Sequence, residues 1–382
     1  MVAYNMTHNI VLLLVHFLSA WCVSAHTWIE QLQIIGANGS YTGDFGYARG
    51  FVDRADPQFD GFSNKWQVPD PATGERRLKT GMELCHPSQR RANYSSQYPR
   101  LHVTPGEYVA MKYLENGHVT IPWDPKGKPK HGGTVWVYGT HDPRPTETLF
   151  NVLQWNKNSS GGDGRGWLLA AQDFDDGRCH QLNDAEVSRR RQLQFPNTFP
   201  DQPDAPVEQW CETDVKIPND IKVHSVLTIY WVWGWETAPG SDHATCGKDE
   251  YYVSCLDVEV RRKTDTAELP EHRLDQQDPQ RAAVHNYQKR SALREEPLII
   301  TKDTCTPQGA SVTATSALSS GTEMGSLQEQ LRQDTARTPL LTATENATSK
   351  VAYAGSLSCN DTIVSTITLT STLKATKTVT LD

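Results

Sequence analysis

The sequence of 382 residues lacks an apolar run long enough to cross a membrane as a helix. Its main apolar run, IVLLLVHFLSAW at positions 10–21, stops short of the roughly 20 residues that a spanning helix needs. The small residues Val23, Ser24 and Ala25 follow it, a pattern typical of a secretory signal peptide and its cleavage site. We therefore expect residues 1–25 to be removed and the mature protein to be secreted, either extracellular or cell-wall associated, with no membrane span. A signal anchor is the alternative interpretation.

Other absences exclude several classes of protein. No Cys-x-x-Cys pair occurs, which argues against a structural zinc site and a thioredoxin-type redox centre. A formal net charge of −8 argues against a nucleic-acid partner and against electrostatic attachment to a membrane. Neither a nucleophile elbow nor a paired-carboxylate arrangement is evident, so a hydrolase is not favoured.

Cysteines and glycosylation sequons fit an oxidising compartment. Eight cysteines include Cys22 inside the leader, so an odd number remains in the mature chain. We expect disulfides, with one cysteine free or paired between molecules. The mature chain has five Asn-x-Ser/Thr sequons, which are acceptors only in the secretory pathway, at Asn38, Asn93, Asn158, Asn346 and Asn360.

Composition divides the mature chain into three parts. Residues 26–262 hold ten of the eleven tryptophans and can form a core, so they are predicted to be the folded domain. Residues 263–296 are charged and rich in glutamine, typical of a solvated linker with at most a marginal helix. Residues 297–382 are rich in serine and threonine and are predicted to be a disordered, glycosylated tail.

The folded part shows strand signals and no convincing helical periodicity. The segments EYVAMKYL, GTVWVYGT, SVLTIYWVWGW and EYYVSCLDVEV are β-branched and aromatic runs bounded by turn residues. Short strands separated by long polar loops predict an all-β, immunoglobulin-like or fibronectin-III-like antiparallel β-sandwich. The loops around 54–82 and 157–205 are long, so we expect them to be functional or stapled by disulfides.

The predicted cleavage after Ala25 makes His26 the first residue of the mature chain. His26 then offers a free α-amine and two ring nitrogens, donors that suit copper. A second histidine is needed to complete such a site. The strongest candidate is His118, because the turn pair Asn116-Gly117 after a strand places it near a sheet end. A surface turn histidine is the alternative. His131 and His141 could substitute, and weaker candidates are His86, His102, His180, His224 and His243.

A third candidate element is the segment around Tyr252. In an alternating strand Glu250, Tyr252 and Ser254 share one face, so Glu250 and Tyr252 could point together at a metal. The simpler alternative is that Tyr252 is a core aromatic and Glu250 an exposed charge at the strand end.

Together these elements resemble the secreted fungal lytic polysaccharide monooxygenases (LPMOs), as an uncharacterised subgroup. The resemblance rests on a leader that ends before His26, on Gly117-His118 after a strand, and on a W-x-W strand followed by E-x-Y-x-x-C. It implies a copper site in which His26 and His118 form a histidine brace and Tyr252 is the axial residue. Glu250 would be the neighbouring carboxylate that orients or protonates the reacting oxygen.

The function that the resemblance implies is oxidative cleavage of glycosidic chains. The cofactor would be copper, the partners would be a polysaccharide substrate and an external electron donor, and the oxidant would be O2 or H2O2. A flat aromatic surface for the glycan could come from Trp66 or from four residues near the N-terminus, Trp28, Tyr41, Phe45 and Tyr47. Core packing is the alternative for these aromatics, and it is favoured for Trp28. Two alternatives remain: a histidine-brace protein that binds or shuttles copper without catalysis, and a structural or adhesive cell-wall glycoprotein.

Overall fold

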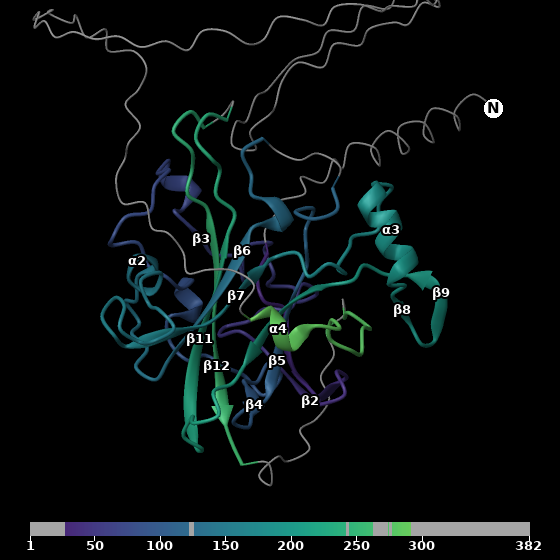
Figure 1. Ribbon diagram of the computed structural model, residues 1–382, viewed down its shortest axis with the longest axis horizontal. Helices are drawn as coiled ribbons and strands as arrows, with labels where there is room; N and C mark the ends of the chain where they lie inside the picture. The colour runs from purple at the N-terminus through teal and green to yellow at the C-terminus, as the bar shows by residue number, and fades with distance from the viewer. Residues whose placement is uncertain (1–26, 122–125, 242–243, 263–273, 275–276, 292–382) are drawn as a thin grey trace, which may run out of the picture. The chain divides into compact units, whose positions relative to one another are not determined.

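The structure is a computed structural model that describes residues 27–121, 126–241, 244–262, 274 and 277–291 (Figure 1). All of these lie in one compact unit, residues 23–307, while a second unit of residues 1–22 and 308–382 falls outside the described residues. His26, the predicted leader and the predicted Ser/Thr-rich tail are therefore predictions that the described residues do not reach. No helix in the described part of the chain is long and apolar enough to cross a membrane.

Two sheets build the domain. The first has four antiparallel strands in the order β10 (Cys211–Lys216), β5 (Tyr108–Tyr113), β1 (Gln31–Ile35) and β2 (Tyr41–Gly46). The second runs in the order β3 (Gln67–Val68), β12 (Tyr251–Val260), β11 (Ser225–Gly234), β6 (Thr134–Thr140) and β7 (Gly166–Asp173). A short strand β4 (Leu101–Val103) adds to β12 in parallel. The predicted all-β, immunoglobulin-like antiparallel sandwich is confirmed.

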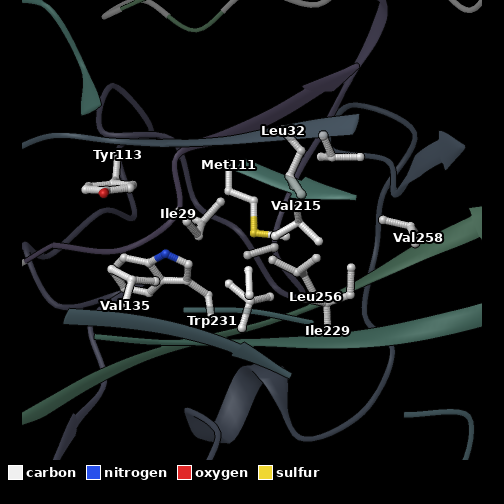
Figure 2. Packing of buried hydrophobic residues seen from close by; sticks show 14 of the residues in the cluster. Ile29, Leu32, Met111, Tyr113, Val135, Val215, Ile229, Trp231, Leu256 and Val258 are labelled. Atoms are coloured by element: carbon white, nitrogen blue, oxygen red, sulfur yellow. The ribbon is translucent and has the colours of Figure 1, made fainter. Parts of the chain in front are cut away.

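The strands predicted from β-branched and aromatic runs are confirmed as β5, β6, β11 and β12. Their inward side chains fill the space between the sheets (Figure 2). Ile29, Leu32 and Met111 from the first sheet side meet Trp231 and Leu256 of the second, and all five are fully buried. Burial of aromatic and branched side chains on facing sheets is the main force that joins them.

The other face of the second sheet is also buried, under loops and a short helix. Tyr251, Val253 and Cys255 point into this second cluster, whereas Tyr252 points into the first, so the predicted alternation along the strand is confirmed. The helix α2 (Leu149–Val152) contributes Leu149 and Val152 to this second cluster. The neighbouring loops contain two short 3-10 helices, η1 (Pro71–Thr73) and η2 (Pro87–Gln89). The disulfide Cys85–Cys255 fastens these loops to β12.

The predicted loop over 157–205 contains more regular structure than expected. It holds β7, the helix α3 (Glu186–Gln194) and the hairpin of β8 (Thr198–Phe199) and β9 (Gln202–Pro206), with α3 and the hairpin side by side in Figure 1. The helix escaped the sequence pattern because EVSRRRQLQ has no apolar stripe; only Ser188 and Arg191 are buried. The expected disulfide staple is present, as Cys179–Cys211.

The solvated-linker prediction for 263–296 does not hold for residues 277–291, which we call the strap. The strap packs on the outer face of the first sheet, where Tyr41 N donates to Arg281 O and Ala283 N donates to Gly39 O, each at 2.9 Å. Val284 and Tyr287 are buried, and the short helix α4 (Tyr287–Arg290) ends the strap. Composition misled here because polar contacts also hold the strap: Arg290 pairs with the buried Asp214, and Val284 N donates to Glu212 Oε1 at 2.5 Å. Outside the strap, Cys246 also forms a disulfide bond.

The sequons within the described residues are accessible. Asn38, Asn93 and Asn158 are all exposed and lie outside the strands and helices. This placement is what attachment of a glycan requires.

Candidate functional site

The start of the described chain is held against the turn that carries His118. Thr27 Oγ1 donates a hydrogen bond to Leu114 O at 2.8 Å and accepts one from Asn116 Nδ2 at 3.3 Å. Two residues later, Ile29 N donates to Ser254 Oγ at 3.1 Å, which ties the same segment to β12. Position 27, the His118 turn and the strand that carries Tyr252 therefore converge, although they are far apart in sequence.

The turn itself depends on a glycine and a carboxylate. Asn116 and Gly117 have φ values of 44° and 83°, and a Cβ on Gly117 would lie 2.3 Å from Ile121 Cδ1. Only glycine fits this position without strain. The predicted Asn-Gly turn is confirmed, and Val119 and Thr120 continue it beyond His118.

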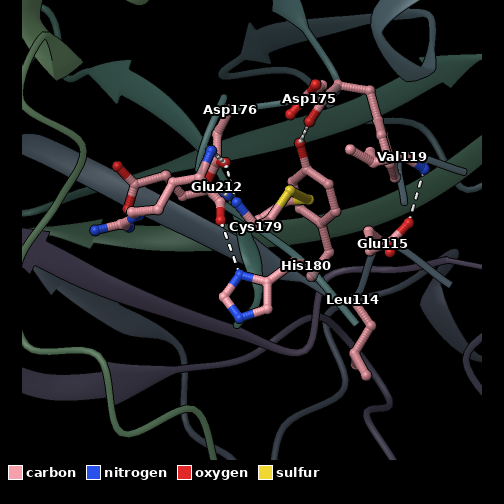
Figure 3. Close-up of a disulfide and its surroundings, with 12 residues drawn as sticks. Leu114, Glu115, Val119, Asp175, Asp176, Cys179, His180 and Glu212 are labelled. Atoms are coloured by element: carbon pink, nitrogen blue, oxygen red, sulfur yellow. Dashed lines mark hydrogen bonds and ion pairs between the residues drawn. A yellow bond between two sulfur atoms is a disulfide. The ribbon is translucent and has the colours of Figure 1, made fainter. Parts of the chain in front are cut away.

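Glu115 closes this turn, and sequence reasoning missed it. Its Oε2 accepts from Val119 N at 2.7 Å and Thr120 N at 3.2 Å, and its Oε1 accepts from Thr120 Oγ1 and Gln181 N (Figure 3). His118 N donates to Glu115 O at 2.9 Å. Burial raises the pKa of Glu115 and these hydrogen bonds lower it, with a net rise. The one signal in the sequence was a carboxylate three residues before the histidine.

If His118 holds copper, as the resemblance implies, Glu115→Gln is expected to weaken that binding, because its amide NH2 would face backbone N–H donors and displace the turn. Outer partners of metal ligands typically change metal affinity about 10- to 100-fold when altered. Glu107→Gln is the matched control, since Glu107 accepts from Thr104 N at 2.7 Å in another turn. Copper titration and thermal unfolding of both variants check this. Equal copper affinities in E115Q and E107Q would contradict a positioning role for Glu115.

The His118 ring sits among indoles. It contacts Trp233 with a centroid separation of 4.7 Å and Trp235 at 4.8 Å, both edge-on, and Phe174 at 6.2 Å. Trp233 also stacks on Tyr252 at 4.9 Å. His118 and Tyr252, placed together by the sequence hypothesis, thus share one indole as a neighbour. The W-x-W strand supplies that indole because successive odd-numbered residues of β11 face the same way.

Tyr252 and Glu250 form a hydrogen-bonded pair. Tyr252, 2% exposed, donates its hydroxyl proton to Glu250 Oε1 at 2.7 Å. Burial raises the pKa of Tyr252 well above its ordinary value, and the Glu250 carboxylate raises it further. The phenol is therefore neutral at physiological pH.

Two lysines meet on the same carboxylate, which sequence reasoning did not anticipate. Glu250 Oε2 accepts from Lys128 Nζ at 2.9 Å and from Lys248 Nζ at 3.0 Å. Burial alone would raise the pKa of Glu250, but these ammonium groups and the Tyr252 hydroxyl outweigh it and lower the pKa. Lys248 could have been found, two residues before Glu250 in sequence. Lys128, 122 residues away, could not.

The structure describes several of the other candidate histidines. His131 and His141 are exposed, as expected for loop residues, and His141 lies against Trp167. His180 is buried, with Nδ1 3.1 Å from Arg178 O. His243 lies outside the described residues.

Only some of the aromatic residues proposed for a glycan-binding surface are exposed to solvent. Trp28 and Tyr47 are buried in a core cluster and cannot form a flat exposed patch. Tyr41, Phe45 and Trp66 are partly exposed. The prediction of a glycan-facing patch therefore fails for Trp28 and Tyr47, because both rings pack against neighbouring aromatic side chains.

A hollow of about 590 Å³ borders the His118 turn. It is lined by Ile121, Gln181, Leu182, Asn183, Pro206, Val207 and Glu208. Burial, and after it the nearby Glu115 carboxylate, raise the pKa of Glu208 to about 7. The hollow thus places an ionisable group near neutrality beside the turn.

In the described part of the chain, one group of acidic and cysteine side chains has metal-like spacing. Ligand atoms of Asp176, Cys179 and Cys211 lie within 4.8 Å of one another. The two sulfurs are joined as a disulfide and cannot act as thiolates (Figure 3). This group is a structural staple.

Comparisons with known proteins cover most of the domain. The sequence matches the family described as "Domain of unknown function (DUF7492)" over residues 23–286. No curated protein matches the chain.

Several solved structures are similar to the chain. CvAA9A shares 14% identity, with 64% of this chain and 83% of that chain covered and a TM-score of 0.26. A cellulose-active polysaccharide monooxygenase from M. thermophila shares 16% identity over 66% of this chain and 85% of that chain, at a TM-score of 0.25. Cel61B, a glycoside hydrolase family 61 member from Hypocrea jecorina, shares 12% identity, with 65% of this chain and 86% of that chain covered and a TM-score of 0.25. Likeness at these values says nothing about the chemistry of this chain.

Proposed function

We propose that this chain, which belongs to the DUF7492 family, is a secreted copper protein that oxidatively cleaves polysaccharide chains. The observation that carries the proposal is the attachment of Thr27 to the His118 turn. Because residue 27 is held there, a mature chain that begins at His26 would start beside the second histidine. In this proposal His26 and His118 hold the metal and Tyr252 is the axial residue.

The donor set fits copper better than other common metals. One α-amine and imidazole nitrogens are borderline ligands that favour copper, and a neutral phenol suits a weak axial position. The α-amine has an ordinary pKa of about 7.7–8.0, so it becomes a ligand near neutral pH far more readily than a lysine, whose pKa is about 10.4.

The chain's own groups have distinct roles in this proposal. Glu250, anchored by Lys128 and Lys248, holds the Tyr252 hydroxyl proton and so directs the phenol oxygen. Its lowered pKa suits a hydrogen-bond acceptor and not a proton donor. Trp233, Trp235 and Phe174 enclose the His118 ring and keep water from that side.

Bound copper would supply the one-electron chemistry that uses an external reductant and O2 or H2O2 to hydroxylate a C–H bond next to a glycosidic linkage. A polysaccharide substrate and an electron donor are therefore the proposed partners. The disulfides and the exposed sequons support a secreted, extracellular or cell-wall location.

The test starts from secreted protein and has three readouts. N-terminal sequencing is expected to begin at His26, and copper titration followed by electron paramagnetic resonance is expected to show one Cu(II) with nitrogen ligands. With ascorbate and H2O2, at least one insoluble glycan among cellulose, chitin and xylan is expected to release oxidised oligosaccharides. A variant with one alanine inserted before His26 is the matched control and is expected to lose at least about 100-fold in copper affinity, since it removes the chelate of amine and ring.

The outcomes separate the alternatives. Copper binding at His26 without oxidised products would overturn the oxidative function and favour a copper-holding protein. Absence of copper binding, or a start at another residue, would remove both metal functions and leave the structural glycoprotein.

A further inference from the structure

A second cavity lies on the opposite side of the first sheet from the core. It measures about 230 Å³ and is enclosed by the outer face of the sheet, the strap and the β8–β9 turn. Its walls are Gln33, Tyr41, Phe45, Lys112, Phe199, Pro200, Gln277, Asp278, Pro279, Gln280 and Arg281. None of these residues belongs to the proposed copper site.

Lys112 forms the floor of this cavity and is only 2% exposed. Its Nζ donates to Gln33 Oε1 at 2.9 Å and lies 3.7 Å from the centroid of the Tyr41 ring. An ammonium group has three donors, and within the described residues only the bond to Gln33 uses one of them. A buried amine with unused donors at the floor of a cavity is costly unless a ligand or ordered water satisfies it.

Groups of both signs surround Lys112: Asp278 and Glu212 are negative, whereas Arg178 and the wall residue Arg281 are positive. Burial lowers the pKa of Lys112 to about 8, and Asp278 and Glu212 act in the opposite direction. Asp278 is itself buried and lines the cavity, with Oδ1 accepting from Asn197 Nδ2 at 2.8 Å. A ligand that fits here therefore needs hydroxyl groups that both donate and accept, more than it needs a net charge.

The remaining wall is aromatic, with amides beside it. Tyr41, Phe45 and Phe199 offer ring surfaces, and Gln33 and Gln280 add amide groups. The amide of the third glutamine, Gln277, is hydrogen-bonded to Gln31. The cavity is smaller than the roughly 300–1,000 Å³ of sites for drug-sized ligands, so it admits about one ring. A pyranose has apolar C–H faces for the aromatic rings and equatorial hydroxyls for lysine, carboxylate and amide groups.

We propose that this cavity binds a single neutral pyranose unit, at a chain end or branch of a glycan, independently of copper. The site would hold the protein on a glycan through one ring. Its affinity is expected to be in the millimolar range, as for other small polar ligands.

The experiment uses the metal-free full-length protein and methyl glycosides of glucose, galactose, mannose and N-acetylglucosamine. Their blocked anomeric carbon cannot form a Schiff base with lysine. Saturation-transfer NMR and calorimetry are expected to show binding of at least one glycoside. Lys112→Met is expected to weaken it at least tenfold. Lys216→Met is the matched control, because Lys216 is exposed on the same sheet face and lies outside the cavity.

A second measurement does not depend on a variant that folds. Reductive methylation with formaldehyde, read by peptide mass spectrometry, reports the access to each lysine in the unmodified chain. The bound glycoside is expected to slow methylation of Lys112 at least fivefold and to leave Lys216 unchanged. The proposal is overturned if no glycoside binds, if Lys112 is not protected, or if inorganic phosphate protects it and neutral glycosides do not. Because the protein is metal-free, these results are independent of the copper function.

Discussion

Replacing His118 with alanine is expected to abolish tight Cu(II) binding and leave the sandwich folded. Substitution of a residue that hydrogen-bonds to a metal ligand typically lowers metal affinity about 10- to 100-fold. Loss of the ligand itself should therefore lower copper affinity by more than 100-fold. The fold should survive because His118 is partly exposed in a turn and packs only at the edge of the core, against Trp233 and Trp235. Copper titration by electron paramagnetic resonance and urea unfolding measure the two effects separately.

Two further variants sharpen this result. His141→Ala is the matched control, because the His141 ring is exposed and lies against Trp167, away from the indoles that surround His118. Tyr252→Phe keeps a ring stacked on Trp233 and removes only the hydroxyl that Glu250 accepts. We expect it to retain copper and to change the resonance spectrum. If H118A binds copper as tightly as H141A, the brace is wrong.

Replacing Arg290 with methionine is expected to destabilise the domain by about 3–5 kcal/mol, the usual cost of removing one partner of a buried ion pair. Arg290 Nε lies 2.8 Å from Asp214 Oδ2, and both side chains are almost fully buried. The variant would leave Asp214 beside Glu212 without its cation. Since the free energy of unfolding of a domain is about 5–15 kcal/mol, this substitution would remove a large part of it. Urea unfolding measures it.

The matched control is Lys289→Met, an exposed neighbour in α4 that should change stability by less than about 0.5 kcal/mol. Equal midpoints for R290M and K289M would show that the strap does not dock as described. The double variant Asp214→Asn/Arg290→Met should recover part of the loss, because it leaves no unpaired charge.

The deficit of R290M should also depend on pH. Burial already raises the pKa of Asp214 well above its ordinary value, with Glu212 adding to the rise and Arg290 opposing it. Without Arg290 the pKa in the folded state rises further. A raised folded-state pKa in an acid means that stability falls as pH rises above the unfolded-state value, so the deficit should be smaller near pH 4 than at pH 7.

Local features of the site were accessible from sequence. The Asn116-Gly117 pair predicted the turn because few other residues tolerate positive φ there. The two-residue period of a strand placed Glu250 and Tyr252 together, and their hydrogen bond agrees with this. The copper role of these residues stays a prediction, as does that of His26.

Interactions between distant segments were not accessible. The pairing of Lys128 with Glu250 and the closing of the His118 turn by Gln181 N depend on loops whose paths no local pattern specifies. For Trp28 the sequence left both a glycan-facing surface and core packing open, and the structure buries it, because an aromatic residue has the same sequence pattern in either place.

By itself the sequence determined four of the strands, β5, β6, β11 and β12, the alternation of faces along β12 and the turn before His118, since each depends on neighbours along the chain. Tertiary structure alone decided that the strap docks, that α3 forms and that Lys112 lies beneath a cavity. Those outcomes depend on charges and rings brought together from remote strands. A polar segment such as the strap resembles a linker until the buried carboxylates that hold it are in place.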